Sequence, residues 1–388
     1  MGKWVKKKLG EVIIDSYAGG TPNRNREDFF GGEIPWVTSG EVNNPEIIST
    51  MENITEAGIK GSSAKWIPEN SILVALYGAT AGQVSMLKIK ATSNQAVLAI
   101  IPNNEIIDTD FLHNQICFNK QNLLFLAQGS GQPNLSKNIV DRLPISYPSS
   151  LSEQRRIASI LSSADKVIDS TQKLIAKYKQ IKQGMMEDLL KPKEGWKKVK
   201  LGECCEINPK TDTSKVLDDD IIVFVKMEDV SNDGFITSFN EKTYQSLQKK
   251  GFTVFQNDDV IFAKITPCME NGKGALVRDF DTKICMGSTE FHVIRACENI
   301  SIDFIYQLTI SKQFRLKAEM QMTGSAGQQR VPISFLEDYL FYIPDLSEQC
   351  RIASILSGID KKIESEEKVL EKYKKIKKGL MEKLLNCE

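Results

Sequence analysis

Two segments of 40 residues carry an apolar pattern typical of long helices. Residues 151–190 and 346–385 contain no proline and are rich in Lys, Glu, Gln, Leu, Ile and Met, which favour helix. Ser152 and Ser347 stand where an N-cap is expected, and each is followed by a glutamate in the first turn. The pattern predicts two helices of about 38 residues, each roughly 57 Å long at 1.5 Å per residue.

Apolar residues recur at heptad spacing in both segments, and the resulting stripe is wider than one partner helix can cover. We therefore expect the two helices to pair as a coiled coil and each helix to meet a further neighbour. The alternative is that each helix packs only on its own globular domain. The predicted coiled-coil interface consists of Ile157, Ile160, Leu161, Val167, Ile168, Leu174, Ile175, Tyr178 and Ile181 in the first helix, and Ile352, Ile355, Leu356, Ile363, Val369, Leu370, Tyr373 and Ile376 in the second.

The segments that precede the long helices mix strand and helix patterns. Residues 71–89 and 258–277 each predict a strand, a glycine-rich turn and a second strand. The stretches IPWVTSGEV and IIVFVKMEDV predict an earlier strand that runs into a polar turn. Residues 108–127 and 303–320 each predict a helix. An α+β fold of about 145 residues, present twice, fits these patterns.

The chain repeats itself. At an offset of 195, residues 151–190 and 346–385 align without a gap and are identical at 26 of 40 positions. A weaker sequence similarity precedes each copy, since KWVKKKLGEV near the N-terminus resembles GWKKVKLGEC after the first helix. The order is A-B-A′-B′, in which the B copies nearly agree and the A copies differ. This pseudo-twofold repeat predicts domains at residues 1–150 and 194–345, with spacer helices at 151–193 and 346–388.

Composition narrows the class of protein. With 388 residues, 41% hydrophobic and 26% charged, the chain is typical of soluble globular proteins. It has no apolar run of membrane-spanning length and no apolar stretch of a secretory signal near its start, which favours the cytoplasm. The eight cysteines form no CxxC pair, and His113 and His292 lie far apart, so we expect neither a zinc site nor a disulfide framework.

Charge gives no support for nucleic-acid binding. The 50 basic residues balance 50 acidic ones, whereas an electrostatically driven DNA-binding domain is usually basic. Residues 1–150 carry 13 basic and 14 acidic side chains, and residues 194–345 carry 18 and 23. The helical segments are basic, with 9 against 5 in residues 151–193 and 10 against 8 in residues 346–388. Evidence for DNA binding must therefore come from motifs.

The repeated helix start carries the most specific motif. Both copies begin LSEQxRIASIL, in which Glu153-Gln154, Arg156 and Ile157 recur as Glu348-Gln349, Arg351 and Ile352. With the Gly-Ser and Gln-bearing segment and the proline-bearing stretch before each copy, this tandem resembles the specificity subunits of type I restriction-modification systems (the HsdS family) over essentially the whole chain. The resemblance implies two target-recognition domains, each reading one half of a split double-stranded DNA sequence, and two antiparallel helices that form the spacer between them.

The resemblance also implies partners. Modification (methyltransferase) subunits, expected in two copies, and restriction subunits assemble on such a frame, and they hold the S-adenosylmethionine, ATP and magnesium. This chain is then expected to be no enzyme, with no catalytic residue, cofactor, metal or membrane contact. The sequence agrees, because Gly272-Lys273 is followed by Gly274 and so is no GxxxxGK[ST] phosphate loop, and Asn208 begins only a fragment of an amino-methyltransferase motif.

Candidate DNA-binding residues lie in the predicted loops. Arg and Lys read guanine, Asn and Gln read adenine, and Ser, Thr, Lys and backbone amides contact phosphates. For each position the alternative is an ordinary exposed turn residue, and the Gln328-Gln329-Arg330 run is the strongest candidate. The candidates are Thr21, Arg24, Arg26, Thr38, Ser39, Tyr77, Thr80, Gln83, Ser130, Gln132, Asn134 and Lys137 in the first domain, and Lys226, Lys264, Thr266, Asn271, Lys273, Ser325, Gln328, Gln329 and Arg330 in the second.

Other classes of protein stay open at this point. One is a coiled-coil adaptor whose globular domains bind proteins, which a DNA mobility shift would distinguish. Another is an enzyme with a site in the 71–89 loop, against which the absence of paired carboxylates, histidine bases and a phosphate loop argues. The same fold also suits a restriction-modification system of another type. The DNA target and the spacer length are not readable from the sequence.

Overall fold

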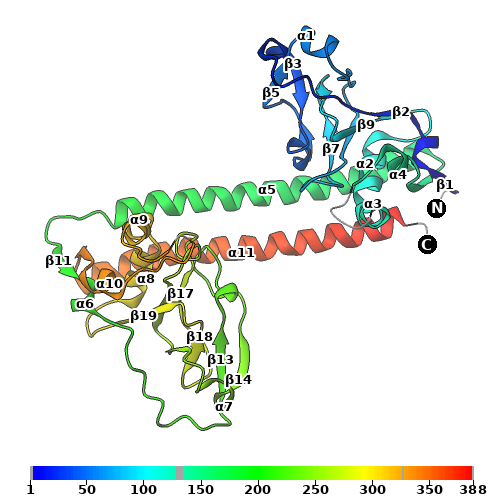
Figure 1. The fold of residues 1–388 in the computed structure, drawn as a ribbon. Coiled ribbons are helices and arrows are strands. Elements are labelled where there is room, and N and C mark those ends of the chain that lie inside the picture. The colour runs from blue at the N-terminus through cyan, green and yellow to red at the C-terminus, as the bar shows by residue number, and fades with distance from the viewer. Residues whose placement is uncertain (1–2, 128–133, 326, 387–388) are drawn as a thin grey trace. The chain divides into compact units, whose positions relative to one another are not determined.

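The computed structural model describes residues 3–127, 134–325 and 327–386 (Figure 1). The chain divides into two compact units: unit 1 comprises residues 1–172 with 368–388, and unit 2 comprises residues 173–367. Each unit holds one α+β domain and parts of both long helices, so each long helix begins in one unit and ends in the other. Among the described residues, no helix combines the length and the hydrophobicity needed to cross a membrane.

The first domain and its helix follow one another in a mixed order of elements. These are β1 (Trp4–Lys8), β2 (Ile13–Ala18), β3 (Phe30–Val37), β4 (Glu46–Ile47), β5 (Glu52–Ile54), α1 (Glu56–Lys60), β6 (Ile72–Ala75), β7 (Val84–Leu87), β8 (Thr92–Ser93), β9 (Val97–Pro102), α2 (Thr109–Phe118), α3 (Lys120–Leu126), α4 (Lys137–Asp141), β10 (Pro144–Pro148) and the long helix α5 (Leu151–Leu189).

The second domain repeats this order with small differences. Its elements are β11 (Lys197–Lys200), α6 (Leu201–Cys204), β12 (Cys205–Ile207), β13 (Ile221–Val225), β14 (Asn240–Thr243), α7 (Tyr244–Leu247), β15 (Thr253–Phe255), β16 (Asp259–Ala263), β17 (Gly274–Leu276), β18 (Cys285–Gly287), β19 (Phe291–Ala296), α8 (Ile302–Ile310), α9 (Lys312–Met320), α10 (Ile333–Asp338), β20 (Leu340–Ile343) and the long helix α11 (Leu346–Leu385).

The two domains share a sheet topology. In unit 1 the sheets have the orders β2-β9-β6-β7-β4 and β5-β3-β8, and in unit 2 they have the orders β12-β19-β16-β17 and β14-β13-β18-β15. A parallel pair stands at the same place in each domain, β3 with β8 and β13 with β18. A two-stranded antiparallel sheet, β1-β10 or β11-β20, joins the start of each domain to the strand before its long helix. The prediction of two similar α+β domains is confirmed.

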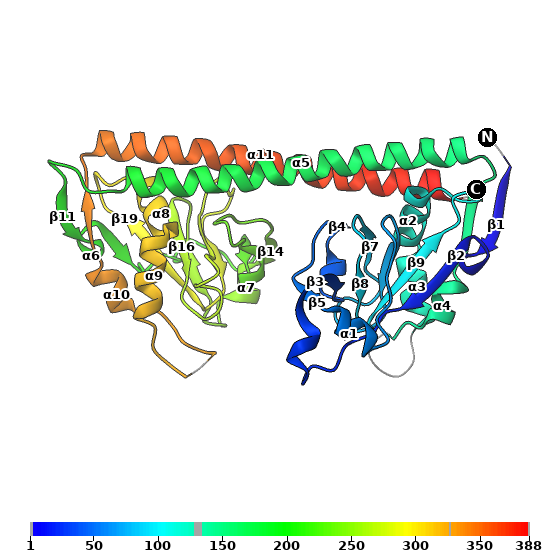
Figure 2. The same cartoon turned by 90° about the horizontal axis from the view of Figure 1, so that it is seen from above.

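Helices cover one sheet of each unit. In unit 1 α2 packs on β7, and in unit 2 α8 packs on β16 and β19 (Figure 2). Fully buried side chains of the sheet and of these helices, such as Ile100 with Phe111 and Ile294 with Phe304, form the two main cores. The start of each long helix belongs to the core of its own domain.

Each helix predicted over residues 108–127 and 303–320 is in fact two short helices. α2 ends before Asn119, whose side-chain amide donates a hydrogen bond to the backbone carbonyl of Gln115 (2.9 Å). In unit 2 the backbone of Ser311 is extended, and its hydroxyl accepts a hydrogen bond from the amide of Phe314 to cap α9. Local side-chain hydrogen bonds therefore interrupt an otherwise continuous apolar pattern.

The two long helices are confirmed, at 39 residues for α5 and 40 for α11. Both begin two residues earlier than the predicted caps require, so Ser152 and Ser347 lie inside the first turn and are not N-caps. At α11 the cap is Asp345, because its carboxylate accepts a hydrogen bond from the amide of Glu348 at 2.9 Å.

Within each unit the two long helices lie antiparallel. In unit 2 the ammonium of Lys182 is 2.5 Å from the carboxylate of Asp360, and in unit 1 that of Lys377 is 2.5 Å from that of Asp165. These positions are related by the 195-residue offset, so the same ion pair forms twice with the roles of the helices exchanged. At the end of α11, Leu385 is buried in the core of unit 1.

The predicted coiled-coil residues have unlike surroundings. Ile157, Leu161, Ile352 and Leu356 are buried in the cores of their own domains, as the alternative expected. Ile175 and Ile363 are buried further along the helices, while Ile160, Ile168, Leu174, Tyr178, Ile355, Val369 and Leu370 are half-buried. Contrary to the prediction, four others are exposed: Val167, Ile181, Tyr373 and Ile376. One partner helix covers one side of the apolar stripe, and the other side stays open to solvent.

The repeated LSEQ motif attaches each long helix to its own domain. The side-chain oxygen of Gln154 accepts a hydrogen bond from the amide of Asp108 (2.7 Å), and its nitrogen donates to the carbonyl of Pro148 (2.8 Å). Gln349 repeats both bonds, with the amide of Ser301 (2.9 Å) and with a proline carbonyl (3.0 Å). Both glutamines are buried, so the motif fixes the first turn of the long helix against the start of α2 or α8.

Candidate nucleic-acid interface

Several loops of unit 1 meet around the short connection between β8 and β9. Backbone hydrogen bonds of 2.8 to 2.9 Å join them, from the amides of Gly20, Asn94, Leu76 and Leu135 to the carbonyls of Ser93, Val37, Ala96 and Leu76, respectively. The loops after β2, β3 and β6 and the segment before α4 therefore lie side by side. We call residues 19–21, 38–41, 76–83, 93–96 and 134–136 the unit 1 loop cluster.

Unit 2 builds the corresponding arrangement around the connection between β18 and β19. Its hydrogen bonds of 2.9 to 3.1 Å run from the amides of Ser288, Lys264 and Val331 to the carbonyls of Val225, Glu290 and Lys264, respectively. Each of these bonds has a counterpart in unit 1. We call residues 226–231, 264–273, 288–290, 323–325 and 327–331 the unit 2 loop cluster.

A buried carboxylate fixes the loop after the first central strand in both clusters. In unit 1 Glu41 accepts hydrogen bonds from the amide and the hydroxyl of Thr38 (2.8 and 2.9 Å). In unit 2 Asp229 accepts from the amide of Lys226 (2.8 Å) and the hydroxyl of Ser238 (2.6 Å). Both carboxylates are buried. The two clusters thus share a backbone frame and present different side chains on it.

Most predicted residues of the first domain lie in the unit 1 loop cluster. The Thr21 hydroxyl is hydrogen-bonded to the side chain of Gln95, and Gln83 accepts from the ammonium of Lys120 (2.9 Å). The cluster also contains Thr38, Ser39, Tyr77, Thr80 and Asn134, of which Asn134 is exposed and the others are half-buried.

The basic candidates of the first domain are engaged by acidic neighbours. Arg24 lies 2.6 Å from Glu52, with its guanidinium 4.7 and 5.0 Å from the ring centroids of Phe30 and Trp36. Arg26 pairs with Asp28 (2.7 Å).

Lys137 is turned away from the cluster. Its ammonium donates to the Ser16 hydroxyl and to the Asp141 carboxylate, both at 2.6 Å. Ser130 and Gln132 lie outside the described residues.

In unit 2 the turn after β16 and the loop after α9 come together. The amide and the hydroxyl of Thr266 donate to the carbonyl of Gln329 (3.0 and 3.2 Å). The ammonium of Lys273 donates to the carbonyl of Met227 (2.7 Å), which brings in the loop after β13. All nine candidates of the second domain therefore belong to one cluster: Lys226, Lys264, Thr266, Asn271, Lys273, Ser325, Gln328, Gln329 and Arg330. Of these, Lys226, Asn271, Ser325, Gln328 and Arg330 are exposed.

Arg330, part of the strongest candidate run, is held by a carboxylate. Its guanidinium makes two hydrogen bonds to Glu290, of 2.9 and 2.8 Å. The bond from Arg330 lowers the pKa of the Glu290 carboxyl, and the same bond raises the pKa of Arg330. To contact a guanine, this arginine must exchange Glu290 for the base.

His292 lies beneath the same cluster on β19. One ring nitrogen, Nε2, donates to the carbonyl of Val331 (2.9 Å), and the other, Nδ1, accepts from the side-chain Nδ2 of Asn208 (3.0 Å). Burial lowers the pKa of His292, which keeps the ring neutral as these two bonds require.

Sequence reasoning missed the residues of the β8–β9 and β18–β19 connections. Gln95 is exposed beside Thr21, and Glu290 holds Arg330. The signal available was a short polar run, Ser-Asn-Gln or Ser-Thr-Glu, between two apolar stretches. The candidate arginines Arg24, Arg26 and Arg330 each lie beside a carboxylate. This pairing explains how a chain without net charge presents arginines at its loops. Within the described part of the chain, no group of three or more His, Cys, Asp or Glu residues could hold a metal ion.

The comparisons with known proteins agree across the chain. The sequence profile described as "Type I restriction modification DNA specificity domain" matches residues 1–180 and again residues 193–375. The specificity subunit of the type I restriction enzyme EcoEI from Escherichia coli is 36% identical over 172 residues, which are 43% of this chain and 28% of that protein. That of EcoAI, also from Escherichia coli, is 42% identical over 163 residues, 41% of this chain and 27% of that protein.

A third relative is similar over nearly the whole chain. The specificity subunit of the type I restriction enzyme MjaVIII from Methanocaldococcus jannaschii is 26% identical over 404 residues, 99% of this chain and 89% of that protein. The matches to the two Escherichia coli relatives thus span less than a third of their lengths.

Solved structures share the fold. The S subunit of a type I restriction-modification system from M. genitalium has a TM-score of 0.60 at 14% identity, over 100% of this chain and 97% of that chain. A chain from a structure on the assembly and conformational transition of a type I system has a TM-score of 0.58 at 15% identity, over 100% and 98%.

Proposed function

Because the chain belongs to the family of type I restriction-modification DNA specificity domains, we propose that it is the DNA specificity subunit of a type I restriction-modification complex. The observation that carries this proposal is the pair of loop clusters: one backbone frame, present twice, with different polar side chains on it. A protein that reads two different half-sequences through one docking geometry needs this combination.

Each loop cluster reads one half of a bipartite double-stranded target. Candidate base readers are Asn134 and Gln95 in the first cluster and Asn271, Gln328 and Arg330 in the second, since these types present the donors and acceptors that the major groove distinguishes. Thr and Ser hydroxyls and the amides of the glycine turns are suited to phosphates.

The long helices set the distance between the half-sites and dock two methyltransferase subunits. The exposed apolar residues Val167, Ile181, Tyr373 and Ile376 support such docking, because they lie at heptad positions that are not covered within this chain. Methyl transfer and DNA cleavage, with S-adenosylmethionine, ATP and magnesium, belong to the modification and restriction subunits in the cytoplasm.

The balanced charge predicts that the isolated chain binds DNA weakly. Specific binders gain much of their affinity from counterion release by clustered cations, and here Arg24, Arg26 and Arg330 are each paired with a carboxylate. The partner subunits would supply the missing phosphate contacts. Tight sequence-specific binding by the isolated chain at physiological salt contradicts this expectation.

A domain exchange tests the proposed function. Residues 1–150 are replaced with the equivalent domain of a relative that recognises another target, and the methylated motif is determined by methylation sequencing of cells that also express the modification subunit. One half of the motif should change and the other should stay the same. The reciprocal exchange of residues 194–345 is the matched control and should change the other half. A change in both halves, or loss of methylation from a complex that still assembles, refutes independent reading.

A further inference from the structure

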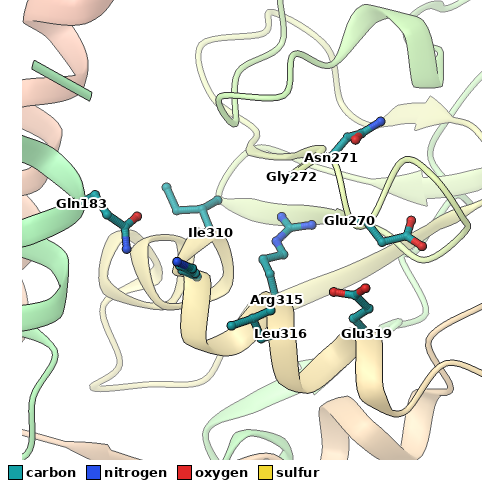
Figure 3. A pocket seen from close by; sticks show the side chains of 9 residues that line it. Gln183, Glu270, Asn271, Gly272, Ile310, Arg315, Leu316 and Glu319 are labelled. Atoms are coloured by element: carbon teal, nitrogen blue, oxygen red, sulfur yellow. The ribbon is translucent and has the colours of Figure 1, made fainter. Parts of the chain in front are cut away.

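A buried arginine lies under the unit 2 loop cluster. Arg315 extends from α9 towards the segment that carries Glu270, Asn271 and Gly272, at the wall of a cavity of about 270 Å³ (Figure 3). Its side chain is almost fully buried. Its Nε donates to the carbonyl of Thr309 at 2.8 Å, and its guanidinium lies 4.4 Å from the ring centroid of Phe262.

The same guanidinium donates hydrogen bonds to both ends of one turn. Nη1 donates to the carbonyls of Met269 (3.2 Å) and Lys273 (3.1 Å). Between these two residues the chain turns through Gly272, whose φ of +86° is in the left-handed region, and exposes Asn271. The arginine therefore fixes the two ends of the turn whose tip belongs to the candidate interface.

Close approach by the guanidinium depends on a neighbouring glycine. A Cβ atom at Gly274 would lie 2.8 Å from Nη2 of Arg315. Gly274 on β17 and Arg315 on α9 therefore pack closely together. A side chain larger than that of glycine at position 274 would displace the guanidinium.

Stability alone does not account for this residue. Among the described residues, the Arg315 guanidinium donates to backbone carbonyls and forms no ion pair, and its Nη2 has no hydrogen-bond partner. Burial lowers the pKa of Arg315 to about 9, so the side chain is still charged at neutral pH. A buried charge without a counter-ion costs folding free energy, and apolar replacements of such groups are often neutral or stabilising. The carbonyls of Met269 and Lys273 also accept bonds from the amides of Gly272 and Ala263, so they stay satisfied without the arginine.

We propose that Arg315 is a positioning residue for DNA recognition: it holds the Met269–Lys273 turn so that Asn271 and Lys273 meet the second half-site in a fixed register. This inference rests on the proposed function. Arg315 itself is too deeply buried to touch DNA, and it acts through the turn.

Unit 1 holds its equivalent turn by other means. There the ammonium of Lys120 donates to Gln83, and a Cβ atom at Gly82 would meet the side chain of Leu124 at 3.1 Å. Both holding residues come from α3, the counterpart of α9. The arginine is thus a feature of unit 2, and its loss should affect one half-site only.

The test uses the complex assembled with its methyltransferase subunits and duplex oligonucleotides that carry the host's methylated motif. Single base changes are placed in either half, and equilibrium dissociation constants give the discrimination at each position. Arg315→Lys keeps the charge but cannot span both carbonyls, and Arg315→Met removes the charge. Both should lower discrimination at second-half positions by about tenfold and leave the first half unchanged. Lys317→Met is the matched control on α9, since Lys317 lies over the ring of Tyr339 and not at the turn.

The outcomes for the variants test the inference, and the outcome for the unaltered complex tests the proposed function. Unchanged second-half discrimination in both variants overturns the inference, as does an equal loss in both halves. Failure of both variants to fold or assemble also overturns it, because Arg315 would then serve the stability of the domain. If the unaltered complex itself shows no discrimination in either half, the proposed function fails, and the inference fails with it. Asn271→Ala should reproduce the loss without a change in the melting temperature of the complex.

Discussion

Replacing Asp360 with asparagine should destabilise unit 2 far more than Asp165→Asn destabilises unit 1, although the two aspartates occupy equivalent positions. Both form an ion pair with a lysine of the other long helix at 2.5 Å, Asp360 with Lys182 and Asp165 with Lys377. The surroundings differ. In unit 2 the aspartate and lysine side chains are 7% and 11% exposed, and in unit 1 they are 49% and 25% exposed.

The magnitude follows from this difference in burial. Removing one partner of a buried pair leaves an uncompensated charge and costs about 3–5 kcal/mol, whereas pairs near the surface contribute about 0–1 kcal/mol. Asp360→Asn also weakens the hydrogen bond of 3.0 Å that Asp360 accepts from Gln307. We expect a difference of about 3 kcal/mol between the two variants. At an m-value of about 2 kcal/mol per M urea, this shifts the unfolding midpoint by about 1.5 M.

Hydrogen exchange measured by mass spectrometry along a urea series separates the two units. Peptides from residues 173–189 and 346–367 report on unit 2, and peptides from 151–172 and 368–385 report on unit 1. The double variant Lys182→Met, Asp360→Leu is the control, because replacing both partners by apolar groups should recover most of the loss. Equal midpoint shifts for the two single variants, or a double variant as unstable as Asp360→Asn, would refute the argument from burial.

Three further predictions concern Gln154, His292 and the length of the long helices. Gln154→Leu should destabilise unit 1 by about 2–3 kcal/mol, because it leaves the amide of Asp108 and the facing carbonyls without their partner, and urea unfolding measures this. Since burial lowers the pKa of His292 below its value in the unfolded chain, protonation favours unfolding. The stability of unit 2 should therefore fall as the pH drops below about 6.5, and His292→Leu, which copies Leu98 of the first domain, should remove this dependence in melting curves recorded from pH 7.5 to 5. Duplicating seven residues in both long helices adds about 10 Å to each, so the unread spacer in the methylated motif should grow by about three base pairs if the helices set it; an unchanged spacer in an assembled complex would show that they only dock partners.

The long helices could be predicted because a short-range pattern determines them, and the domain repeat could be predicted because the sequence aligns with itself. A heptad stripe without proline is sufficient for a helix, and the 195-residue offset shows the repeat directly. The breaks at Asn119 and Ser311 were not foreseen, because each depends on a single side chain that bonds to a nearby backbone group inside an apolar pattern. The strand pairs that bring β8 beside β3 and β18 beside β13 depend on contacts distant in sequence.

The sequence predicted which loops form the candidate site better than it predicted the contacts that their side chains make. Glycine turns and polar runs pointed to the segments that the structure brings together, such as Thr266 with Gln329. The partners of the arginines were not apparent, since Glu52 and Glu290 are distant in sequence from Arg24 and Arg330. Arg315 was missed for the same reason: the two carbonyls of the turn that it holds are more than 40 residues away, and a carbonyl has no signature in the sequence.

The near-identity of the two long helices follows from how they pair. Asp165 binds Lys377, and the positions 195 residues away, Asp360 and Lys182, bind each other. Each position therefore has its partner in the other copy, as in an isologous dimer interface where residue i contacts j and j contacts i. A change in one copy would meet an unchanged partner in the other. A loop side chain such as Gln328 is not required to match a residue of the other copy. The loop clusters are therefore free to differ, while the helices are held alike. Two unlike half-sites can then be read from one repeated frame.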